Sequence, residues 1–154
     1  MEIDCAVTSA RFTDAKIHEI VMHREDYVLC GAPSLLAKIP FKKAEDARAH
    51  TLLDISAEAP LFRYVRDAGA DLRFGGVNRL GTIAAIRARA LAGAGVAVLP
   101  LYFVKDDLAR NKLVRLLPKT TPHHDFFRLI FRADDPRRVV YEGVAKALSE
   151  EPLR

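Results

Sequence analysis

The segment Ala90–Pro118 (ALAGAGVAVLPLYFVKDDLARNKLVRLLP) constrains the fold more than any other part of the chain. It reads as the end of a helix, a glycine turn, a buried strand over Val96–Leu99, a second helix and a second strand. Gly93 or Gly95 is expected at positive φ, because glycine lacks a Cβ and can end a helix in that conformation. We interpret this turn as structural, since a phosphate-binding loop needs its glycines before a helix rather than after one.

Strands and helices alternate along the rest of the chain as well. The expected strands are short apolar runs over Ile3–Ser9, Lys16–Pro33, Thr51–Ile55, Asp71–Asn78, Leu113–Leu116 and Phe126–Phe131. The second of these is one long strand or two consecutive ones, broken near Arg24–Asp26. The expected helices cover Ala59–Ala70, Leu80–Ala92, Leu101–Arg110 and Pro136–Ser149, with a short one after Phe41. Such alternation predicts an α/β fold with βαβ units and a mostly parallel sheet covered by helices.

Composition places the chain among ordinary globular domains. Its 154 residues suit one domain or two small lobes, with 50% apolar and 29% charged residues. The net charge of +4 suits small anionic ligands, although a solvated surface of mixed sign is favoured. Cys5 and Cys30 are too few for a disulfide framework or a zinc site, which indicates a reducing compartment. Neither a signal-peptide pattern nor an apolar run of about 18 residues is present, so we expect a cytoplasmic protein without membrane contact.

No arrangement of residues indicates catalysis. Acidic residues occur in adjacent pairs, whose side chains point in different directions and fit solvated turns or helix ends: Glu25/Asp26, Asp106/Asp107 and Asp134/Asp135. Cys30 lies in an apolar strand, where a buried thiol is inert. The sequence contains no nucleotide-binding, metalloprotease or serine-hydrolase signature. We therefore expect neither an enzyme nor a cofactor.

Metal and nucleic-acid binding are not indicated either. His18 and His23 are five residues apart in a strand, which puts them on opposite faces, and His123–His124 suit a surface loop. The arginines are dispersed without interleaved aromatics, which predicts solvated faces for Arg63/Arg66, Arg87/Arg89, Arg128/Arg132 and Arg137/Arg138. If the intact protein reads DNA, it does so through a domain that this chain lacks.

Six motifs in a fixed order resemble the effector-binding domain of LysR-type transcriptional regulators. The strongest are LAGAGVAVLP (Leu91–Pro100) and LARNKLVRLLP (Leu108–Pro118), the latter with Asn111 where that family often has Gly. The others are Glu2–Ser9, His23–Ala37, Gly76–Ile83 and Phe127–Leu148. The resemblance covers nearly the whole chain. It implies a periplasmic-binding-protein-like (type II) fold of two lobes, with mixed sheets flanked by helices.

The resemblance also implies that part of the family's architecture is missing. That family has an N-terminal winged helix-turn-helix, and its effector domain opens with a βαβα segment; this chain starts after both. Residues 1–29 plus 125–154 would form a partial lobe one, and residues 30–122 would form lobe two. An expressed fragment, a short gene product and a remnant all fit this pattern. Because lobe one would lack strands that pair with its own, its exposed apolar edge predicts a homo-oligomer.

A ligand site is expected in the loops that follow the strands, because ligands of open α/β sheets bind beyond the carboxyl ends of the strands. This rule and the resemblance select the same three loops. The candidate ligand-binding residues are Thr8, Ser9 and Arg11 after the first strand, Ser56 and Glu58 after the strand Thr51–Ile55, and Val77, Asn78 and Leu80 around the start of the helix Leu80–Ala92. Arg11 could clamp a carboxylate in bidentate fashion, although an exposed arginine is the alternative. Thr8 and Ser9 also fit turn positions, and Asn78 fits a helix N-cap.

The expected function is the ligand-sensing part of a LysR-type transcriptional regulator. A small-molecule effector, with carboxylates as one class, would bind between the two lobes and shift lobe closure and subunit packing. DNA would be bound only through an N-terminal domain outside this chain. The alternative is a periplasmic-binding-protein-like domain without a role in transcription, such as a solute receptor or an enzyme accessory. The missing export signal argues against the receptor.

Overall fold

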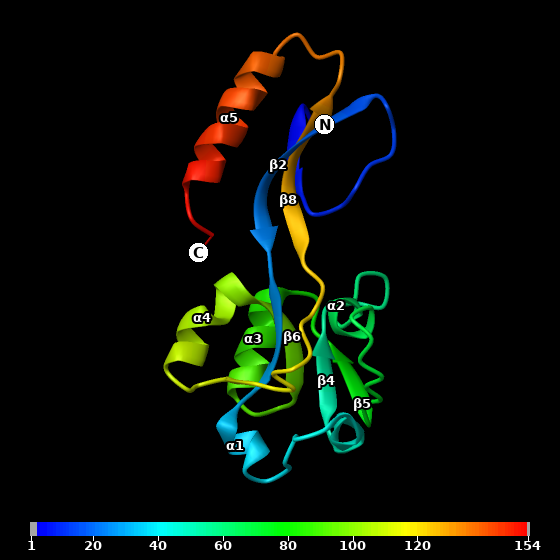
Figure 1. Ribbon diagram of the computed structural model, residues 1–154, viewed down its shortest axis with the longest axis vertical. Coiled ribbons are helices and arrows are strands. Elements are labelled where there is room, and N and C mark those ends of the chain that lie inside the picture. The colour runs from blue at the N-terminus through cyan, green and yellow to red at the C-terminus, as the bar shows by residue number, and fades with distance from the viewer. Residues whose placement is uncertain (1–2, 154) are drawn as a thin grey trace. The chain divides into compact units, whose positions relative to one another are not determined.

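The computed structural model describes residues 3–153. The chain divides into two compact units (Figure 1). Unit 1 consists of residues 1–25 together with 125–154, and unit 2 is the continuous segment Asp26–His124. The chain therefore passes from unit 1 into unit 2 once and returns once.

Unit 1 is a three-stranded antiparallel sheet with one helix. The sheet has the order β1-β8-β2, with β1 over Cys5–Thr8, β8 over Asp125–Arg132 and β2 over Ile17–Glu25. Helix α5 (Arg138–Glu150) packs on this sheet through a small core of Leu129, Phe131, Tyr141 and Ala145. The expected return strand and last helix are confirmed: β8 is a run rich in apolar residues, and the apolar residues of α5 recur at helical spacing.

A β-bulge in β2 changes which side chains share a face. The register of β2 on β8 shifts between Val21 and His23, so Met22 is an extra residue. His18 pairs with Phe131 and His23 with Phe127, which puts both histidines on the face that α5 covers. His23 Nε2 lies 2.8 Å from the carbonyl oxygen of Leu148 in α5. The prediction of opposite faces is therefore wrong, because a bulge resets the two-residue period.

Unit 2 is built on a five-stranded mixed sheet of order β5-β4-β6-β3-β7. Its strands are β3 (Tyr27–Gly31), β4 (Thr51–Asp54), β5 (Gly76–Arg79), β6 (Val96–Pro100) and β7 (Val114–Arg115). Strand β4 is parallel to β5 and β6, whereas β3 is antiparallel to β6 and β7, so β3 alone runs against the other four. The expectation of mixed sheets is confirmed. Parallel pairing is less common than expected, because two of the four pairings in this sheet and both pairings in the sheet of unit 1 are antiparallel.

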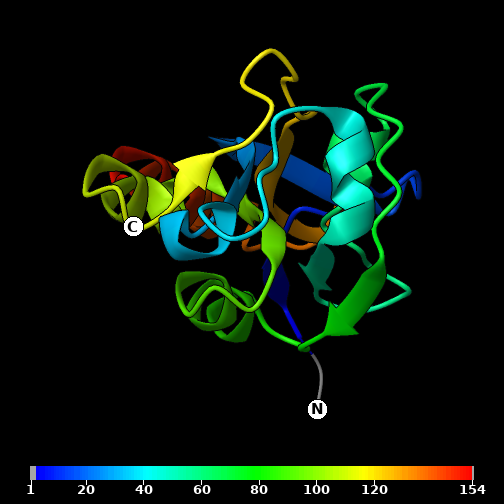
Figure 2. The same ribbon diagram turned by 90° about the horizontal axis from the view of Figure 1, so that it is seen from below.

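The helices of unit 2 are short. They are α1 (Pro33–Leu36), the 3₁₀-helix η1 (Ala44–Ala49), α2 (Arg63–Arg66), α3 (Ile83–Leu91) and α4 (Leu101–Ala109). Figure 2 shows η1 (cyan) beside the start of β5, where the Gly75 N–H donates to the carbonyl oxygen of His50. The core of the unit is centred on β3 and β6, whose residues are all buried. Among the described residues, no helix is long and apolar enough to cross a membrane.

Most predicted elements are somewhat shorter in the structure, and two of them differ most in where they begin. The predicted helix Ala59–Ala70 is reduced to the four residues of α2. The buried carboxylate of Asp54 holds the backbone N–H groups of Ile55 and Leu61, which fixes the preceding residues as a loop. The predicted strand Asp71–Asn78 begins only at Gly76.

The boundary between the units also differs from the expected lobe limits. Residues 27–29, expected in lobe one, belong to β3, which is hydrogen-bonded into the sheet of unit 2. Where the chain leaves unit 2 and re-enters unit 1, the His123 N–H donates to the carbonyl oxygen of Tyr64. Unit 2 therefore extends to His124 rather than to residue 122. The backbone pairing of these residues therefore places the crossings at Glu25/Asp26 and His124/Asp125.

The glycine turn before β6 uses its two glycines for different purposes. Gly93 has φ +73°, as expected for a glycine that ends a helix. Gly95 lies outside the left-handed region, but a Cβ there would be 2.5 Å from the carbonyl oxygen of Thr51 and 3.0 Å from the Leu53 side chain. Gly95 thus lets the chain pass close to β4. Pro100 ends β6 and precedes the first residue of α4, as predicted.

Candidate ligand-binding site

The carboxyl ends of β4 and β5 meet at one edge of the unit 2 sheet. These strands are parallel and in register, with Asp54 opposite Arg79. Beyond them, the Leu80 N–H donates to the carbonyl oxygen of Asp54 at 2.9 Å, and the Gly81 N–H donates to that of Ile55 at 3.1 Å. The loop after β4 and the turn before α3 are therefore joined, which brings two of the three predicted ligand loops together.

Asp54 shapes this edge, although sequence reasoning did not select it. Its side chain is buried, and Oδ1 accepts the N–H of Ile55 at 2.8 Å and that of Leu61 at 2.7 Å. A buried carboxylate that accepts backbone N–H groups stabilises an irregular loop, because it satisfies donors that no strand or helix can reach. The signal in the sequence was an aspartate directly after the apolar residues Leu52 and Leu53.

The predicted residues of the loop after β4 are Ser56 and Glu58. Ser56 Oγ accepts the Ala59 N–H at 3.1 Å, so this hydroxyl also stabilises the turn. Glu58 is exposed, and its pKa is lowered by a hydrogen bond from its own backbone N–H, by the Ser56 side chain and by the positive charge of Arg79. Glu58 is thus ionised at neutral pH, and it can accept hydrogen bonds or a cationic group from a ligand.

The remaining candidates of unit 2 follow the edge strand β5. Val77 and Asn78 are exposed, whereas Leu80 is half-buried and packs against the core. Thr82, rather than Asn78, is the N-cap of α3, because its Oγ1 accepts the Ala85 N–H at 3.2 Å. The N-cap alternative for Asn78 is therefore wrong, since Asn78 lies within β5, before the helix. The N-terminus of α3, with its partial positive charge, adjoins the turn at Gly81.

In unit 1, the loop after β1 carries Thr8, Ser9 and Arg11. Thr8 Oγ1 accepts the Ala10 N–H at 3.0 Å, which is the turn role that the sequence left open. Ser9 is half-buried and Arg11 is exposed. The carbonyl oxygen of Ser9 accepts a hydrogen bond from Nη1 of Arg128 at 3.2 Å. The conformation of this loop is therefore held from β8.

Arg128 was expected on a solvated face, and that prediction is wrong. Its side chain is only 5% exposed, with Nε 3.0 Å from a Glu19 carboxylate oxygen and Nη1 3.3 Å from one of Asp125. Nη1 also donates to the carbonyl oxygen of Phe126 at 2.7 Å. A guanidinium can be buried when its donors are satisfied in this way. Spacing along β8 could have revealed it, because Arg128 lies between the apolar residues Phe127 and Leu129.

Two of the paired acids are also buried rather than solvated. Glu25 and Asp107 are each 4% exposed. Asp107 accepts two hydrogen bonds from Arg87, at 2.6 Å to Nε and 3.0 Å to Nη2, which links α4 to α3. This bidentate pair neutralises the carboxylate and explains why it can be buried. The same hydrogen bonds raise the pKa of Arg87.

The chemistry of these residues suits binding rather than reaction. Burial, together with the negative charge of Asp107, raises the pKa of Cys30 to about 12, so its thiol stays protonated at neutral pH. Within residues 3–153, no group of three or more His, Cys, Asp or Glu side chains could hold a metal ion. The joined loops of unit 2 instead offer exposed polar side chains and a helix N-terminus, which are the usual elements of a small-molecule site.

Comparison with known proteins identifies the family. The profile of the LysR substrate binding domain matches residues 1–152. The chain belongs to this family. It is accordingly a LysR substrate-binding domain with a periplasmic-binding-protein-like type II fold, and it serves ligand sensing in a transcriptional regulator. Membership favours this function over a solute receptor or an enzyme accessory, and the family is one of regulatory domains rather than enzymes.

Solved structures of LysR-type regulators share the fold. The regulatory domain of CrgA from Neisseria meningitidis superposes with TM-score 0.67 at 19% identity, covering 95% of this chain and 76% of that domain. The C-terminal domains of a LysR family protein from Agrobacterium tumefaciens superpose with TM-score 0.76 at 18% identity, covering 96% of this chain and 71% of that one. Full-length LysG from Corynebacterium glutamicum, with bound effector Arg, gives TM-score 0.76 at 17% identity, covering 99% and 53%. This chain thus spans about half the length of that full-length regulator. No curated protein matches it.

Proposed function

We propose that this LysR substrate-binding domain binds a small anionic effector, with carboxylates as the first class, through the loops that follow β4 and β5. The observation that carries the proposal is the pair of hydrogen bonds from Leu80 and Gly81 to the backbone of β4 and its loop, which joins Ser56, Asn78 and the N-terminus of α3 into one polar edge. A helix N-terminus attracts negative charge, and the exposed amide of Asn78 can donate to a carboxylate.

The proposal extends to unit 1 through the loop after β1. There Arg11 would bind a carboxylate by itself, supported by the hydrogen bond between Arg128 and Ser9 that fixes the preceding backbone. Units 1 and 2 would then correspond to the partial lobe one and the lobe two of the family. Effector binding would change the equilibrium between lobe arrangements, and a DNA-binding domain outside these 154 residues would respond. The protein would act in the cytoplasm as a homo-oligomer.

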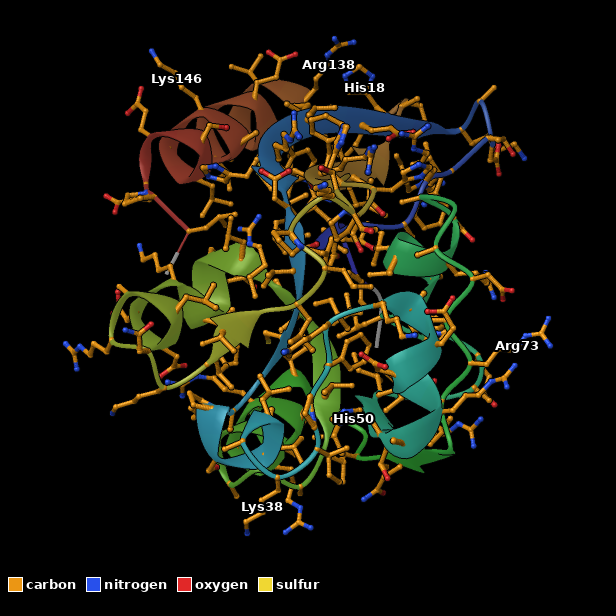
Figure 3. The ribbon with its side chains drawn as sticks, turned by 60° about the horizontal axis from the view of Figure 1, so that its bottom comes forward. His18, Lys38, His50, Arg73, Arg138 and Lys146 are labelled. Atoms are coloured by element: carbon orange, nitrogen blue, oxygen red, sulfur yellow. The ribbon has the colours of Figure 1, made fainter. Side chains whose placement is uncertain are left out.

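The test is a thermal-shift screen with defined probes: the twenty L-amino acids, succinate and benzoate. Carboxylates that raise the melting temperature would then be titrated by calorimetry into the parent and into Asn78→Ala. Asn78 is exposed and Lys38 is exposed elsewhere in unit 2 (Figure 3), so Lys38→Ala is the matched control. We expect Asn78→Ala to weaken binding about tenfold and Lys38→Ala to leave it unchanged, since one lost hydrogen bond costs about 1–1.5 kcal/mol.

Two results would contradict the proposal. If no carboxylate in the screen stabilises the parent, the ligand class is wrong. If a carboxylate binds equally to the parent and to Asn78→Ala, and hydrogen exchange shows protection away from residues 55–61 and 77–85, the location is wrong.

A further inference from the structure

Unit 2 contains a pocket at the edge of its sheet opposite the candidate effector site. The pocket has a volume of about 280 Å³ and lies between η1 and the segment that leads into β5, which Figure 2 shows side by side. Strands β4 and β5 begin just after these two segments, so the pocket lies at the amino ends of the strands whose carboxyl ends carry the candidate effector loops. We call it the η1 pocket. Its lining residues are Ala44, Glu45, Arg48, Asp71 and Arg73.

The backbone holds the two walls of the η1 pocket together. The Gly75 N–H donates to the carbonyl oxygen of His50 at 3.0 Å, and a Cβ at Gly75 would overlap the carbonyl oxygen of Arg48. The carboxylate of Asp46 accepts the Lys43 N–H at 3.1 Å, which fixes the start of η1. The shape of the pocket therefore exists before any ligand binds, and little ordering of the chain is needed on binding.

The wall formed by the segment before β5 directs its charged side chains outward. Leu72 is 6% exposed, and Phe74 packs on the core with its ring 5.3 Å from that of Phe62. Asp71 and Arg73 alternate with these apolar residues and are exposed. They form only a loose ion pair, with 3.5 Å between Nε and Oδ1. This wall thus presents one carboxylate and one guanidinium to a ligand.

The η1 wall carries the same two kinds of charge. Glu45 and Arg48 are three residues apart, and a 3₁₀-helix has three residues per turn, so their side chains share one face. Both are exposed, and within residues 3–153 neither of them forms an ion pair. Ala47, on another face of η1, is fully buried in the core. The charges of this wall are therefore available to a ligand.

Two positive and two negative charges select a ligand that carries both signs. A carboxylate without a cationic group would be attracted by the guanidinium groups but repelled by the carboxylates of the pocket, and an amine would experience the reverse. Ala44 is the one apolar residue of the lining, so a large hydrophobic body would gain little. The volume lies near the lower end of the roughly 300–1,000 Å³ of ligand pockets, which limits the ligand to a small molecule.

We propose that the η1 pocket is a second ligand site, which binds a small zwitterion of the α-amino-acid class. Its carboxylate would contact the two guanidinium groups, and its ammonium group would contact the two carboxylates. All four side chains are exposed, and exposed ion pairs contribute little each, so we expect a dissociation constant on the order of 0.1–1 mM. This inference does not depend on the effector site.

The first experiment varies the ligand. The ¹⁵N-labelled chain is titrated with each of the twenty L-amino acids, and amide shifts are followed in residues 44–49 and 71–75. The amino acid that binds most tightly is then compared with the acid that lacks its ammonium group and the amine that lacks its carboxylate, for alanine propionate and ethylamine. We expect both analogues to bind at least about tenfold more weakly, because each leaves two charges of the pocket without a partner.

The second experiment varies the protein. Arg48→Gln and Glu45→Gln each remove one charge of the η1 wall and should weaken binding of that amino acid about fivefold. Lys38 is exposed in unit 2 and lies apart from Arg73 (Figure 3), so Lys38→Gln is the matched control and should change the dissociation constant less than about twofold. Asn78→Ala should leave binding in this pocket unchanged, which separates it from the effector site. Circular dichroism checks that the variants are folded.

Three results would overturn the proposal. In the first, no amino acid at about 50 mM shifts the amides of residues 44–49 or 71–75. In the second, the acid or the amine analogue binds there as tightly as the amino acid. In the third, Arg48→Gln and Lys38→Gln change the dissociation constant equally. Shifts confined to residues 55–61 and 77–85 belong to the first result, because they report the effector site instead.

Discussion

At the scale of single residues, substitutions of Gly93 and Gly95 distinguish a requirement for positive φ from a requirement for space beside the backbone. Gly93 has positive φ, whereas Gly95 has no room for a Cβ beside Thr51. We expect Gly93→Val to lower the free energy of unfolding by about 1–3 kcal/mol and Gly93→Asn to cost less, because asparagine tolerates the left-handed region. Gly95→Ala should itself cost about 1–3 kcal/mol, since the first added carbon causes the clash. Urea unfolding with constant m-values measures all three, and a Gly95→Ala variant that unfolds like the parent would contradict the close approach.

Arg128 offers a second test at this scale. Arg128→Met would remove the partner of Glu19 and Asp125 and the donor to Ser9, and we expect a loss of about 2–4 kcal/mol in the stability of unit 1. Hydrogen exchange should rise in residues 8–12, whose conformation depends on that donor. Adding Glu19→Gln should restore part of the stability, because it removes one uncompensated charge. Equal exchange in residues 8–12 of the parent and Arg128→Met would show that the loop is held by other contacts.

At the scale of elements, the start of α5 depends on an ionised carboxylate. Asp135 accepts hydrogen bonds from the Arg137 side chain, from the Arg137 backbone N–H and from the Tyr141 hydroxyl, and the first of these is the main cause of its strongly lowered pKa. A pKa lower in the folded state than in the unfolded chain means stability that is present above pH about 4 and is lost as the pH falls below it. The free energy of unfolding of the parent should therefore fall more steeply than that of Asp135→Asn as the pH decreases below about 4, as measured by urea unfolding at each pH. Parallel pH profiles would exclude this role.

Elements defined by local pattern were predictable, and those set by distant contacts were not. The strand Val96–Pro100 and the helices on either side follow from apolar runs, glycine and proline, so their positions were correct to within about three residues. The prediction of a helix over Ala59–Ala70 is wrong at its start, because the Leu61 N–H donates to the carboxylate of Asp54, which lies outside the predicted helix. The bulge at Met22 has no local signature, and it reversed the predicted face of His23. Of the site, the loops were predictable from strand ends, whereas Asp54, Thr82 and Arg128 act through contacts that only the fold brings about.

At the scale of the whole molecule, the chain should not read DNA by itself. Arginines such as Arg87 and Arg128 form ion pairs with Asp107 and Glu19. They are not aligned on one helix that could enter a groove of DNA. We expect fluorescence anisotropy with duplex DNA at near-physiological salt to show only weak binding that falls steeply as salt increases. A sequence-dependent dissociation constant below 1 μM would contradict this prediction.

The central position of β8 in unit 1 has a consequence for synthesis on the ribosome. Among the described strands, β1 and β2 pair only with β8, and β8 begins about 100 residues after β2 ends. At roughly 5–20 residues per second, β1 and β2 wait some 5–20 s for their partner, while unit 2, being continuous, can fold as soon as it emerges. Apolar strands of the nascent chain are thus exposed to chaperones and proteases throughout that interval. A ribosome that stops before Asp125 releases a polypeptide in which unit 2 is complete, whereas β1 and β2 lack β8.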